Sequence, residues 1–274
     1  MQNIVEKYDK LRSLLKNTGG LVVAYSGGCD SALLAAVATA TLGSKALCVL
    51  FSTEAYPPRE TEQALKTAEA LGLSVITRTD SMVADGDFTA NTAERCYFCK
   101  KRLFGKLLEI GRQHSLYTVA DGSNLDDSHD YRPGKRAALE LGIISPLQEA
   151  GFTKNDVREL SRQLNLPTWN KPSLACLASR IPYGMKIEPT ALTRIGEAEQ
   201  FLNERGFHQV RVRHHGDIAR IEVGADEIER LAATETRMAV ASEFKKLGYL
   251  YVTLDLNGYT TGSMNAVLKN PQPK

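Results

Sequence analysis

The chain has 274 residues, of which 43% are hydrophobic and 24% are charged, and its formal net charge at pH 7 is +2. This composition is typical of a globular protein with one large or two moderate domains, and it gives no electrostatic case for binding nucleic acid. No stretch has the apolar length of a signal peptide or a membrane span. We therefore expect a cytoplasmic protein, in which the five cysteines are thiols, metal ligands or catalytic groups rather than disulfides.

The first half of the chain alternates short apolar runs with helix-forming stretches. Strands are predicted over 20–25, 45–51, 73–77 and 118–120, and helices over 4–18, 32–38, 59–71, 95–110 and 153–164. Repeated strand–helix–strand units of this length predict an α/β fold with a doubly wound parallel sheet.

The pattern changes at Trp169. Residues 171–184 contain two prolines and show little periodicity, which is typical of a linking segment that contributes to an active site. Beyond it the sequence predicts helices over 189–205 and 225–247 and strands over 209–214, 218–223 and 249–255. We expect an α/β domain over 1–168 and a smaller α+β domain over 169–274.

A glycine-rich turn, Ser26-Gly27-Gly28-Cys29-Asp30-Ser31, lies between the first predicted strand and the helix after it. Backbone N–H groups at such a helix N-terminus bind phosphate. No lysine follows the glycines, so the turn is not a Walker A loop, and the Gly-x-Gly-x-x-Gly dinucleotide motif is absent. An ordinary glycine turn with a polar helix cap is the simpler alternative, and Cys29 is expected to be a small buried thiol.

The order Ser-Gly-Gly-x-Asp-Ser resembles the PP-loop of the ATP pyrophosphatase superfamily, whose members cleave ATP between the α and β phosphates and adenylylate a carbonyl or carboxylate oxygen. The resemblance implies that Asp30 holds Mg²⁺ and takes part in catalysis. It also implies a pyrophosphate site formed by Ser26, Gly27, Gly28 and Ser31. Residues 122–127, Gly-Ser-Asn-Leu-Asp-Asp, resemble a second signature of the superfamily that contacts the nucleotide, although a plain polar loop has the same composition.

Arg132 lies in a polar stretch shortly after this second signature. A guanidinium at this position is suited to clamp a phosphate or a carboxylate, so Arg132 is a candidate for the nucleotide site. A solvated surface arginine is the alternative.

Three cysteines are candidate metal ligands. Cys96 and Cys99 form a C-x-x-C pair, and Cys176 follows much later in the chain. A redox C-x-x-C is expected after the first strand of a βαβ unit, which is not its position here. A structural zinc site needs four nitrogen or sulfur ligands, whereas three cysteines would leave one iron of an iron–sulfur cluster open to a non-protein ligand. The spacing leaves open a shared cluster, a zinc site or independent buried cysteines.

Two arginines alternate in the run Val210-Arg211-Val212-Arg213. On a strand they point to one face. With Arg180 and His214 nearby, they would suit a phosphorylated or carboxylated substrate. A solvated strand face is the alternative.

Motifs along nearly the whole chain resemble the LarE family of sulfur transferases, which build the nickel-pincer nucleotide cofactor of lactate racemase. Besides the PP-loop, the matching motifs are Asp130-Tyr131-Arg132-Pro133-Gly134, Trp169-Asn170-Lys171, Ser179-Arg180-x-Pro182-Tyr183-Gly184, Val210 to Arg213 and Tyr251 to Leu256. The resemblance implies that ATP adenylylates a carboxylate of pyridinium-3,5-biscarboxylic acid mononucleotide and that AMP leaves on attack by sulfur. It also implies a site for the substrate phosphate formed by Ser179, Arg180, Arg211 and Arg213, with Glu199 on a helix facing that pocket.

The family has two sources of sulfur. In one branch a sacrificial cysteine becomes dehydroalanine, and it lies five residues before the Ser-Arg arginine, where this chain has Ala175. Cys176 lies four residues before that arginine, and the sacrificial branch lacks the C-x-x-C pair. The other branch holds a 4Fe-4S cluster with three cysteines, which Cys96, Cys99 and Cys176 match. We therefore favour the cluster, in which an extra sulfide on the open iron attacks the adenylate, over a sacrificial Cys176.

The resemblance implies ATP, Mg²⁺ and a 4Fe-4S cluster as cofactors. Expected partners are a small-molecule nucleotide, sulfide or another sulfur donor, and further copies of the chain, with no nucleic acid and no membrane. A tRNA thiolase is the nearest alternative, but it would need an extended basic surface or a zinc ribbon. Amidating synthetases do not need the three cysteines. A non-catalytic ATP-binding module would bind ATP without releasing AMP.

Overall fold

The computed structural model of the chain describes residues 3–129, 133–172, 175–260 and 262–265. The chain forms two compact units, each built from several segments. Unit 1 comprises Met1–Thr53, Pro58–Ser81 and Glu94–Leu174. Unit 2 comprises Glu54–Pro57, Met82–Ala93 and Ala175–Lys274.

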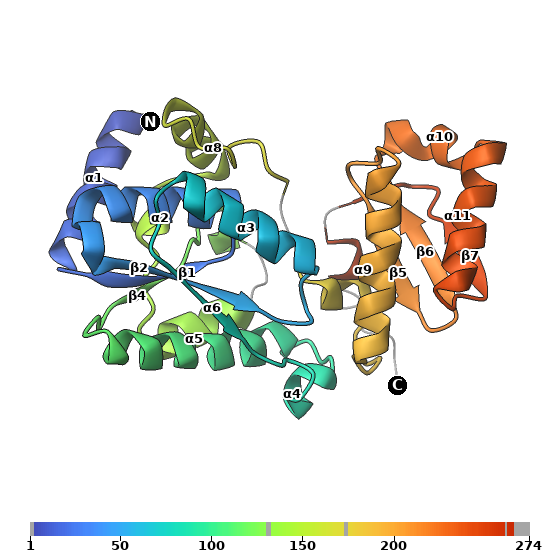
Figure 1. The fold of residues 1–274 in the computed structure, drawn as a ribbon, viewed down its shortest axis with the longest axis horizontal. Coiled ribbons are helices and arrows are strands. Elements are labelled where there is room, and N and C mark those ends of the chain that lie inside the picture. The colour runs from blue at the N-terminus through green and yellow to red at the C-terminus, as the bar shows by residue number, and fades with distance from the viewer. Residues whose placement is uncertain (1–2, 130–132, 173–174, 261, 266–274) are drawn as a thin grey trace. The chain divides into compact units, whose positions relative to one another are not determined.

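Unit 1 is built on a four-stranded parallel sheet (Figure 1). Its strands are β1 (Leu21–Tyr25), β2 (Ala46–Ser52), β3 (Val75–Thr79) and β4 (Val119–Ala120), in the order β3-β2-β1-β4. In the register of the central pair, Val23 lies opposite Cys48. From β1 the chain adds β2 and β3 on one side of the sheet and later β4 on the other side. The boundary between β1 and β4 is therefore a topological switch point, where ligands bind at the carboxyl ends of the strands.

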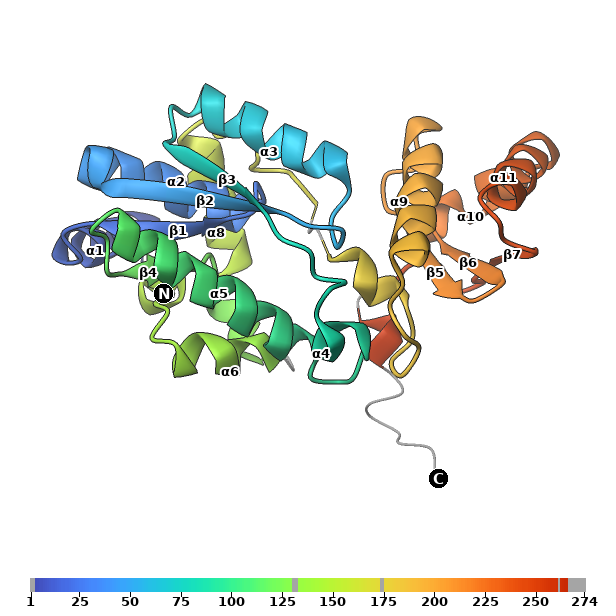
Figure 2. The same ribbon diagram turned by 60° about the horizontal axis from the view of Figure 1, so that its bottom comes forward.

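Helices cover both faces of this sheet (Figure 2). They are α1 (Ile4–Asn17), α2 (Cys29–Leu42), α3 (Pro58–Ala70), α5 (Arg95–Gln113), α6 (Pro133–Glu140), α7 (Pro146–Glu149) and α8 (Lys154–Gln163). Alternate strand residues pack into two separate cores. Val23 and Cys48 pack with α1, α2 and α8, whereas Val22 and Val49 pack with Phe104 on α5. Two apolar faces covered by helices confirm the predicted doubly wound α/β fold.

The helix boundaries follow from local sequence. Thr153 caps α8, and its side chain and that of Asp156 form a reciprocal capping box. Strand β3 begins at Val75, two residues later than predicted. The Leu73 N–H still donates to the Ala68 carbonyl of α3 and completes the turn at Gly72, whose φ is +63°.

Unit 2 contains a three-stranded mixed sheet in the order β5-β6-β7. Strands β5 (Arg211–His215) and β6 (Ile218–Glu222) are antiparallel, and β7 (Tyr251–Leu254) is parallel to β6. Helices α9 (Pro189–Glu204), α10 (Ile228–Ala232) and α11 (Thr234–Lys246) accompany it, with the short 3₁₀ turns η3 (Leu177–Arg180), η4 (Ala225–Glu227) and η5 (Ser263–Asn265). The helical stretch predicted over 225–247 is not continuous, because Ala233 has extended backbone angles between α10 and α11.

Two segments from the first half of the sequence belong to unit 2. Residues 54–57 follow β2, and residues 82–93, which include α4 (Gly86–Thr89), follow β3. No pattern in the sequence indicates that these segments belong with the carboxyl-terminal part. Among the described residues, no helix combines the length and apolar character needed to cross a membrane.

Candidate functional site

The PP-loop of unit 1 connects β1 to α2. Its serines bond to one another: the Ser26 N–H donates to Ser31 Oγ at 3.2 Å, and the Ser31 hydroxyl donates to the carbonyl of Gly28 at 3.2 Å. Gly28 is the N-cap of α2, so the first N–H groups of the helix face the loop. A loop with this geometry presents backbone donors and two hydroxyl groups to an anion.

Gly27 is required by close packing. Its φ is +69°, and a Cβ added to it would lie 2.4 Å from Cβ of Ala64 on α3. The loop after β4 approaches from the other side, because a Cβ on Gly122 would lie 3.0 Å from the Ser31 nitrogen. Both positions therefore accept only glycine without a backbone shift.

Asp30 has two partners from distant parts of unit 1. Asn124 Nδ2 donates to Asp30 Oδ1 at 3.0 Å, and the ammonium group of Lys154 forms an ion pair with Oδ2. Asn124 belongs to the predicted second nucleotide signature, and Asp126 and Asp127 bond to it in turn. The structure thus brings the two sequence motifs together at the carboxyl ends of β1 and β4.

Lys154 was not among the predicted site residues. It occupies the first position of α8, directly after the Thr153 cap, where the local pattern indicates only the start of a helix. Its approach to Asp30 depends on how α8 packs against α2, which no local pattern encodes.

Lys171 and Cys29 complete the surroundings of the loop. The Lys171 ammonium group donates to the Gly27 carbonyl at 3.2 Å and lies 3.1 Å from a carboxylate oxygen of Glu60. The Cys29 thiol is buried against Ser161 and the Trp169 carbonyl, and burial raises its pKa. It is the small buried thiol expected at the variable position. Arg132, the remaining predicted nucleotide ligand, lies outside the described residues.

The five cysteines differ sharply in environment. Cys48 is fully buried in β2, and burial raises its pKa to about 12, so it is a core residue. Cys96 is exposed and Cys99 half-buried, both in the first turn of α5 in unit 1. Cys176 is half-buried at the start of η3 in unit 2.

These environments suit the predicted cluster ligands. The thiols of Cys96, Cys99 and Cys176 are exposed or half-buried, whereas those of Cys29 and Cys48 are buried. The i, i+3 spacing of Cys96 and Cys99 places their side chains on one face of α5. Among the described residues, no three His, Cys, Asp or Glu side chains already stand in an arrangement that could hold a metal ion.

In unit 2, Arg180 is fixed by a buried carboxylate. Its guanidinium bonds Glu199 of α9 at two points, Nε to Oε1 at 2.9 Å and Nη2 to Oε2 at 3.0 Å, and both side chains are less than a tenth exposed. Its Nη1 donates to the carbonyls of Ala175 and Cys176 and to the Ser179 hydroxyl. Arg180 therefore fixes the backbone on either side of Cys176 as well as Ser179.

Arg213 has a second dedicated carboxylate. Glu222, which is fully buried and lies on β6, accepts from Arg213 Nη2 at 2.6 Å and pairs with Arg220. Arg213 also donates to the Ser179 carbonyl at 3.2 Å, which joins β5 to η3. Arg220 in turn pairs with Asp255 at 2.9 Å.

Arg211 and Arg213 lie on the same face of β5, as their alternation predicts, because Arg211 pairs in register with Glu222 and Arg213 with Arg220. The Arg211 guanidinium lies 5.1 Å from the Tyr259 ring centre, and its burial, followed by the nearby charge of Arg180, lowers its pKa. His214 points to the opposite face. It bonds the Tyr249 hydroxyl in the apolar core, so it does not join the arginines.

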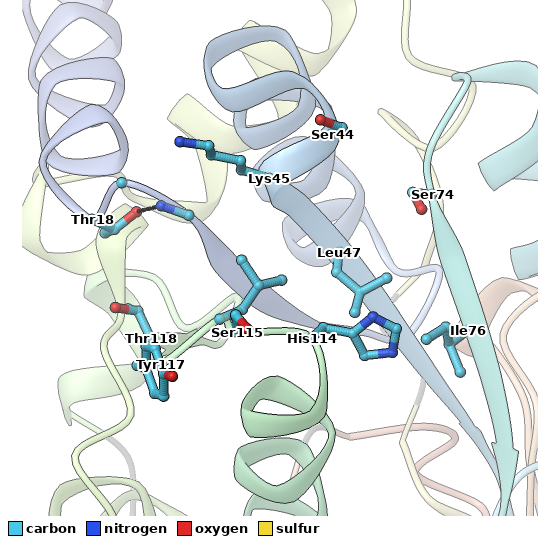
Figure 3. Close-up of a pocket in the computed structure, with 13 residues that line it drawn as sticks. Thr18, Ser44, Lys45, Leu47, Ser74, Ile76, His114, Ser115, Tyr117 and Thr118 are labelled. Carbon is cyan, nitrogen blue, oxygen red and sulfur yellow. Dashed lines mark hydrogen bonds between the residues drawn. The ribbon is translucent and has the colours of Figure 1, made fainter.

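A separate cavity of about 630 Å³ opens at the other end of the unit 1 sheet (Figure 3). Its described lining includes Thr18, Lys45, Ser74 and His114, which lie at the amino ends of the strands. None of the predicted site residues is among them. Open parallel sheets bind ligands at the carboxyl ends of their strands, which is where the PP-loop lies and this cavity does not.

Comparison with known proteins agrees with this geometry. Residues 3–92 match the NAD synthase family model. The chain is 40% identical to an uncharacterised protein of Synechocystis over 263 residues. The matched region covers 96% of this chain and 98% of that protein. The chain is also 37% identical over 273 residues to the pyridinium-3,5-bisthiocarboxylic acid mononucleotide synthase of Lactiplantibacillus plantarum, covering 99% of this chain and 98% of that enzyme.

The chain belongs to the family of this synthase, the LarE family. The comparison confirms the resemblance seen in the sequence, and the protein is an ATP-dependent enzyme of the PP-loop class. A more distant match is the ammonia-dependent NAD⁺ synthetase of Methanococcoides burtonii, 30% identical over 176 residues, which are 58% of this chain and 63% of that enzyme.

The LarE-family motifs fall into both units. The PP-loop and Trp169-Asn170-Lys171 belong to unit 1, whereas Ser179-Arg180 and Val210 to Arg213 belong to unit 2. Glu222 and Lys154 are the charged groups that sequence reasoning missed. Glu222 could have been suspected from its place in a predicted strand, since a carboxylate on a buried strand face needs a cationic partner.

Proposed function

We propose that the enzyme uses ATP to adenylylate a carboxylate of pyridinium-3,5-biscarboxylic acid mononucleotide and then replaces AMP by sulfur. In the first step a carboxylate oxygen of the substrate attacks the α-phosphorus of ATP, and pyrophosphate leaves. In the second step sulfide attacks the acyl carbon, the bond to AMP breaks, and a thiocarboxylate forms.

One observation of the geometry carries this proposal. The residue that carries a candidate sulfur atom, Cys176, is held by the same guanidinium, that of Arg180, that fixes Ser179. An anion-binding cluster built around a thiol-bearing turn is suited to a phosphorylated substrate that reacts with sulfur. A protein that only senses ATP has no need of such a cluster.

The PP-loop residues perform the activation. The backbone at Gly27 and Gly28 and the hydroxyls of Ser26 and Ser31 hold the pyrophosphate portion of ATP. Asp30 supplies carboxylate oxygens for Mg²⁺, and Asn124 keeps that carboxylate oriented. Lys154 adds positive charge beside the phosphates.

The arginine cluster of unit 2 binds the substrate. Ser179, Arg180, Arg211 and Arg213 form the phosphate site. Glu199 and Glu222 fix the orientation of Arg180 and Arg213, because a buried guanidinium with a bidentate carboxylate partner has little rotational freedom. The substrate phosphate therefore meets donors that are already in place.

We further propose that Cys96, Cys99 and Cys176 hold a 4Fe-4S cluster. Their thiols are more accessible than those of Cys29 and Cys48, and the C-x-x-C pair with a third cysteine at Cys176 resembles the three-cysteine branch of the family. When bound, such a cluster offers one iron without a protein ligand, to which an exogenous sulfide can bind. A sacrificial Cys176 is the alternative source of sulfur.

The reaction is tested with purified enzyme, ATP, Mg²⁺ and the biscarboxylate mononucleotide. We expect substrate-dependent release of pyrophosphate and AMP, and a product heavier by the exchange of oxygen for sulfur. ATP binding without pyrophosphate release in the presence of this substrate would reject the proposal.

The sulfur source is tested separately. After anaerobic reconstitution we expect about four irons and four sulfides per chain and a broad absorbance at about 400 nm. Changing Cys96, Cys99 or Cys176 to alanine should abolish the iron, the sulfide and the absorbance. Cys48→Ala is the matched control and should keep the cluster. A protein without iron whose Cys176 loses the mass of H₂S during turnover would establish the sacrificial mechanism instead.

A further inference from the structure

Asn91 is a buried polar residue with an unusual backbone. It is fully buried, and its φ is +52°. Asparagine tolerates this left-handed conformation better than most residues, but burying its amide is costly unless the amide is hydrogen-bonded. The residue belongs to unit 2 although it comes from the first half of the sequence.

Its side chain holds the turn that follows Ser179-Arg180. Asn91 Nδ2 donates to the carbonyl oxygens of Pro182 and Met185, both at 2.8 Å, and approaches that of Ile181 at 3.4 Å. Its own carbonyl accepts from the Gly184 N–H at 3.0 Å. A single residue therefore satisfies backbone groups at four positions of this turn.

The segment around Cys176 relies on such external partners. It contains only the short turn η3, and its remaining backbone groups must bond elsewhere if they are buried. The Leu177 N–H donates to the Ala55 carbonyl at 2.8 Å, and the Ile187 N–H donates to the Thr89 carbonyl at 2.9 Å. Residues that follow β2 and β3 thus fix this segment at both of its ends.

We propose that Asn91 is a positioning residue for the substrate phosphate site. By holding residues 181–185, it sets the place of Ser179 and Arg180, and through the bonds of Arg180 to the carbonyls of Ala175 and Cys176 it also sets the place of that cysteine. This inference rests on the proposed function, because it takes Ser179 and Arg180 as phosphate ligands. Asn91 itself touches no substrate.

The variant Asn91→Gly removes the anchoring side chain. Glycine adopts the left-handed backbone without strain, so the variant loses the side-chain hydrogen bonds and packing without adding backbone strain. We expect KM for the mononucleotide to rise about tenfold, the equivalent of one to two net hydrogen bonds, while KM for ATP stays unchanged. A merely structural residue would change both constants or neither, and either result would overturn the proposal.

Asn165→Gly is the matched control. Asn165 also has a positive φ, +55°, but it is exposed at the end of α8 in unit 1. The control should leave both KM values at their wild-type level. If Asn91→Gly is not recovered as folded protein, Asn91→Ser keeps one short donor and should raise the mononucleotide KM by a smaller factor.

Hydrogen exchange separates this inference from the proposed function. In Asn91→Gly we expect faster exchange at the amides of 177–187, with the strands of unit 1 unchanged. If the wild-type enzyme does not turn over the mononucleotide but the variant shows this local change, the proposed function fails and the anchoring by Asn91 stands. Unchanged exchange at 177–187 would reject the anchoring whatever the enzyme's substrate.

Discussion

Gly27 combines a positive φ with a Cβ position that neighbouring atoms already occupy. The first property is shared by many turn glycines, whereas the second requires knowledge of where α3 lies. The motif predicts a glycine at this site, but only the packing of Ala64 explains why alanine cannot replace it.

We expect Gly27→Ala to lose ATP binding and to lower the free energy of unfolding. Gly72→Ala is the control, because Gly72 at the end of α3 has a φ of +63° with no atom within 4 Å of its Cβ position. Both variants carry the left-handed strain, and the clash should cost Gly27→Ala about 1–3 kcal/mol more. Urea unfolding and calorimetric titration with ATP measure the two effects, and equal behaviour of the two variants would contradict the close-packing argument.

Between elements, Asp80 joins β3 to α5. Its buried carboxylate accepts from Arg102 at 2.8 Å through both Nε and Nη2, and from Lys106 at 2.5 Å. The hydrogen bonds from Arg102, with help from those of Lys106, lower the pKa of Asp80 to about 2. This contact fixes the middle of α5, and Arg102 lies about one helical turn beyond Cys99.

The lowered pKa predicts a pH dependence of stability. Because the folded pKa lies below the unfolded value of about 3.9, the carboxylate contributes about 2 kcal/mol above that value and loses it as the pH falls toward 2. The difference in unfolding free energy between wild type and Asp80→Asn should therefore be largest near neutral pH and shrink below pH 4. Urea titrations from pH 7 to pH 3 test this, with the exposed Asp9→Asn as a control that should show no such trend.

Helix α9 contributes Glu199 to both Arg180 and the sheet. Glu199 Oε1 also accepts from the Val212 N–H at 2.9 Å, so this carboxylate joins α9, η3 and β5. Removing one charge of a buried pair leaves the other without compensation.

We expect Glu199→Gln to lower the unfolding free energy by about 3 kcal/mol, as measured for broken buried pairs. It should also weaken mononucleotide binding, because Arg180 loses its bidentate partner. Glu204→Gln changes an exposed glutamate on the same helix and should have little effect on either quantity. Chemical denaturation measures the stability of both variants, and direct binding measurements give their affinity for the mononucleotide. A Glu199→Gln protein as stable as Glu204→Gln would disprove the role of the Arg180–Glu199 pair.

Taken whole, the chain builds unit 2 from three separate segments. The last hundred residues contain its sheet and long helices, but residues 54–57 and 82–93 supply the bonds to the backbone around Cys176. One apolar cluster of this unit, which includes Phe207, Phe244 and Tyr249, lies within the last segment, whereas Met82 and Phe88 of the 82–93 segment are buried as well.

A fragment of residues 175–274 tests whether residues 54–57 and 82–93 are needed to order the backbone around Cys176. We expect the sheet and helices α9 and α11 to form, because the apolar cluster around Phe207, Phe244 and Tyr249 lies within the fragment, while residues 176–187 lack their anchors and lose order. Dispersed amide signals in a two-dimensional NMR spectrum, with those of 176–187 collapsed to random-coil positions, would be the result. Native-like signals for these residues would show that the first-half segments are dispensable.

The sequence alone predicts most elements and proposes both groups of candidate site residues, for physical reasons that are local. Strand β1, the PP-loop and the Thr153 cap follow from short patterns of apolar, glycine and hydroxyl residues. The pairing of Lys154 with Asp30, of Glu222 with Arg213, and of Asn91 with residues 181–185 joins positions far apart in sequence. These contacts depend on three-dimensional packing, which periodicity does not encode.

The chain passes between the two units five times, and this constrains how such an enzyme could arise or be redesigned. Fusing the coding region for residues 175–274 to another PP-loop domain would transfer the sheet and its arginines but leave behind Ala55 and Asn91. We expect a working chimera to need the loops after β2 and β3 together with the carboxyl-terminal part. A single crossover point before residue 175 would separate these loops from the backbone to which they bond.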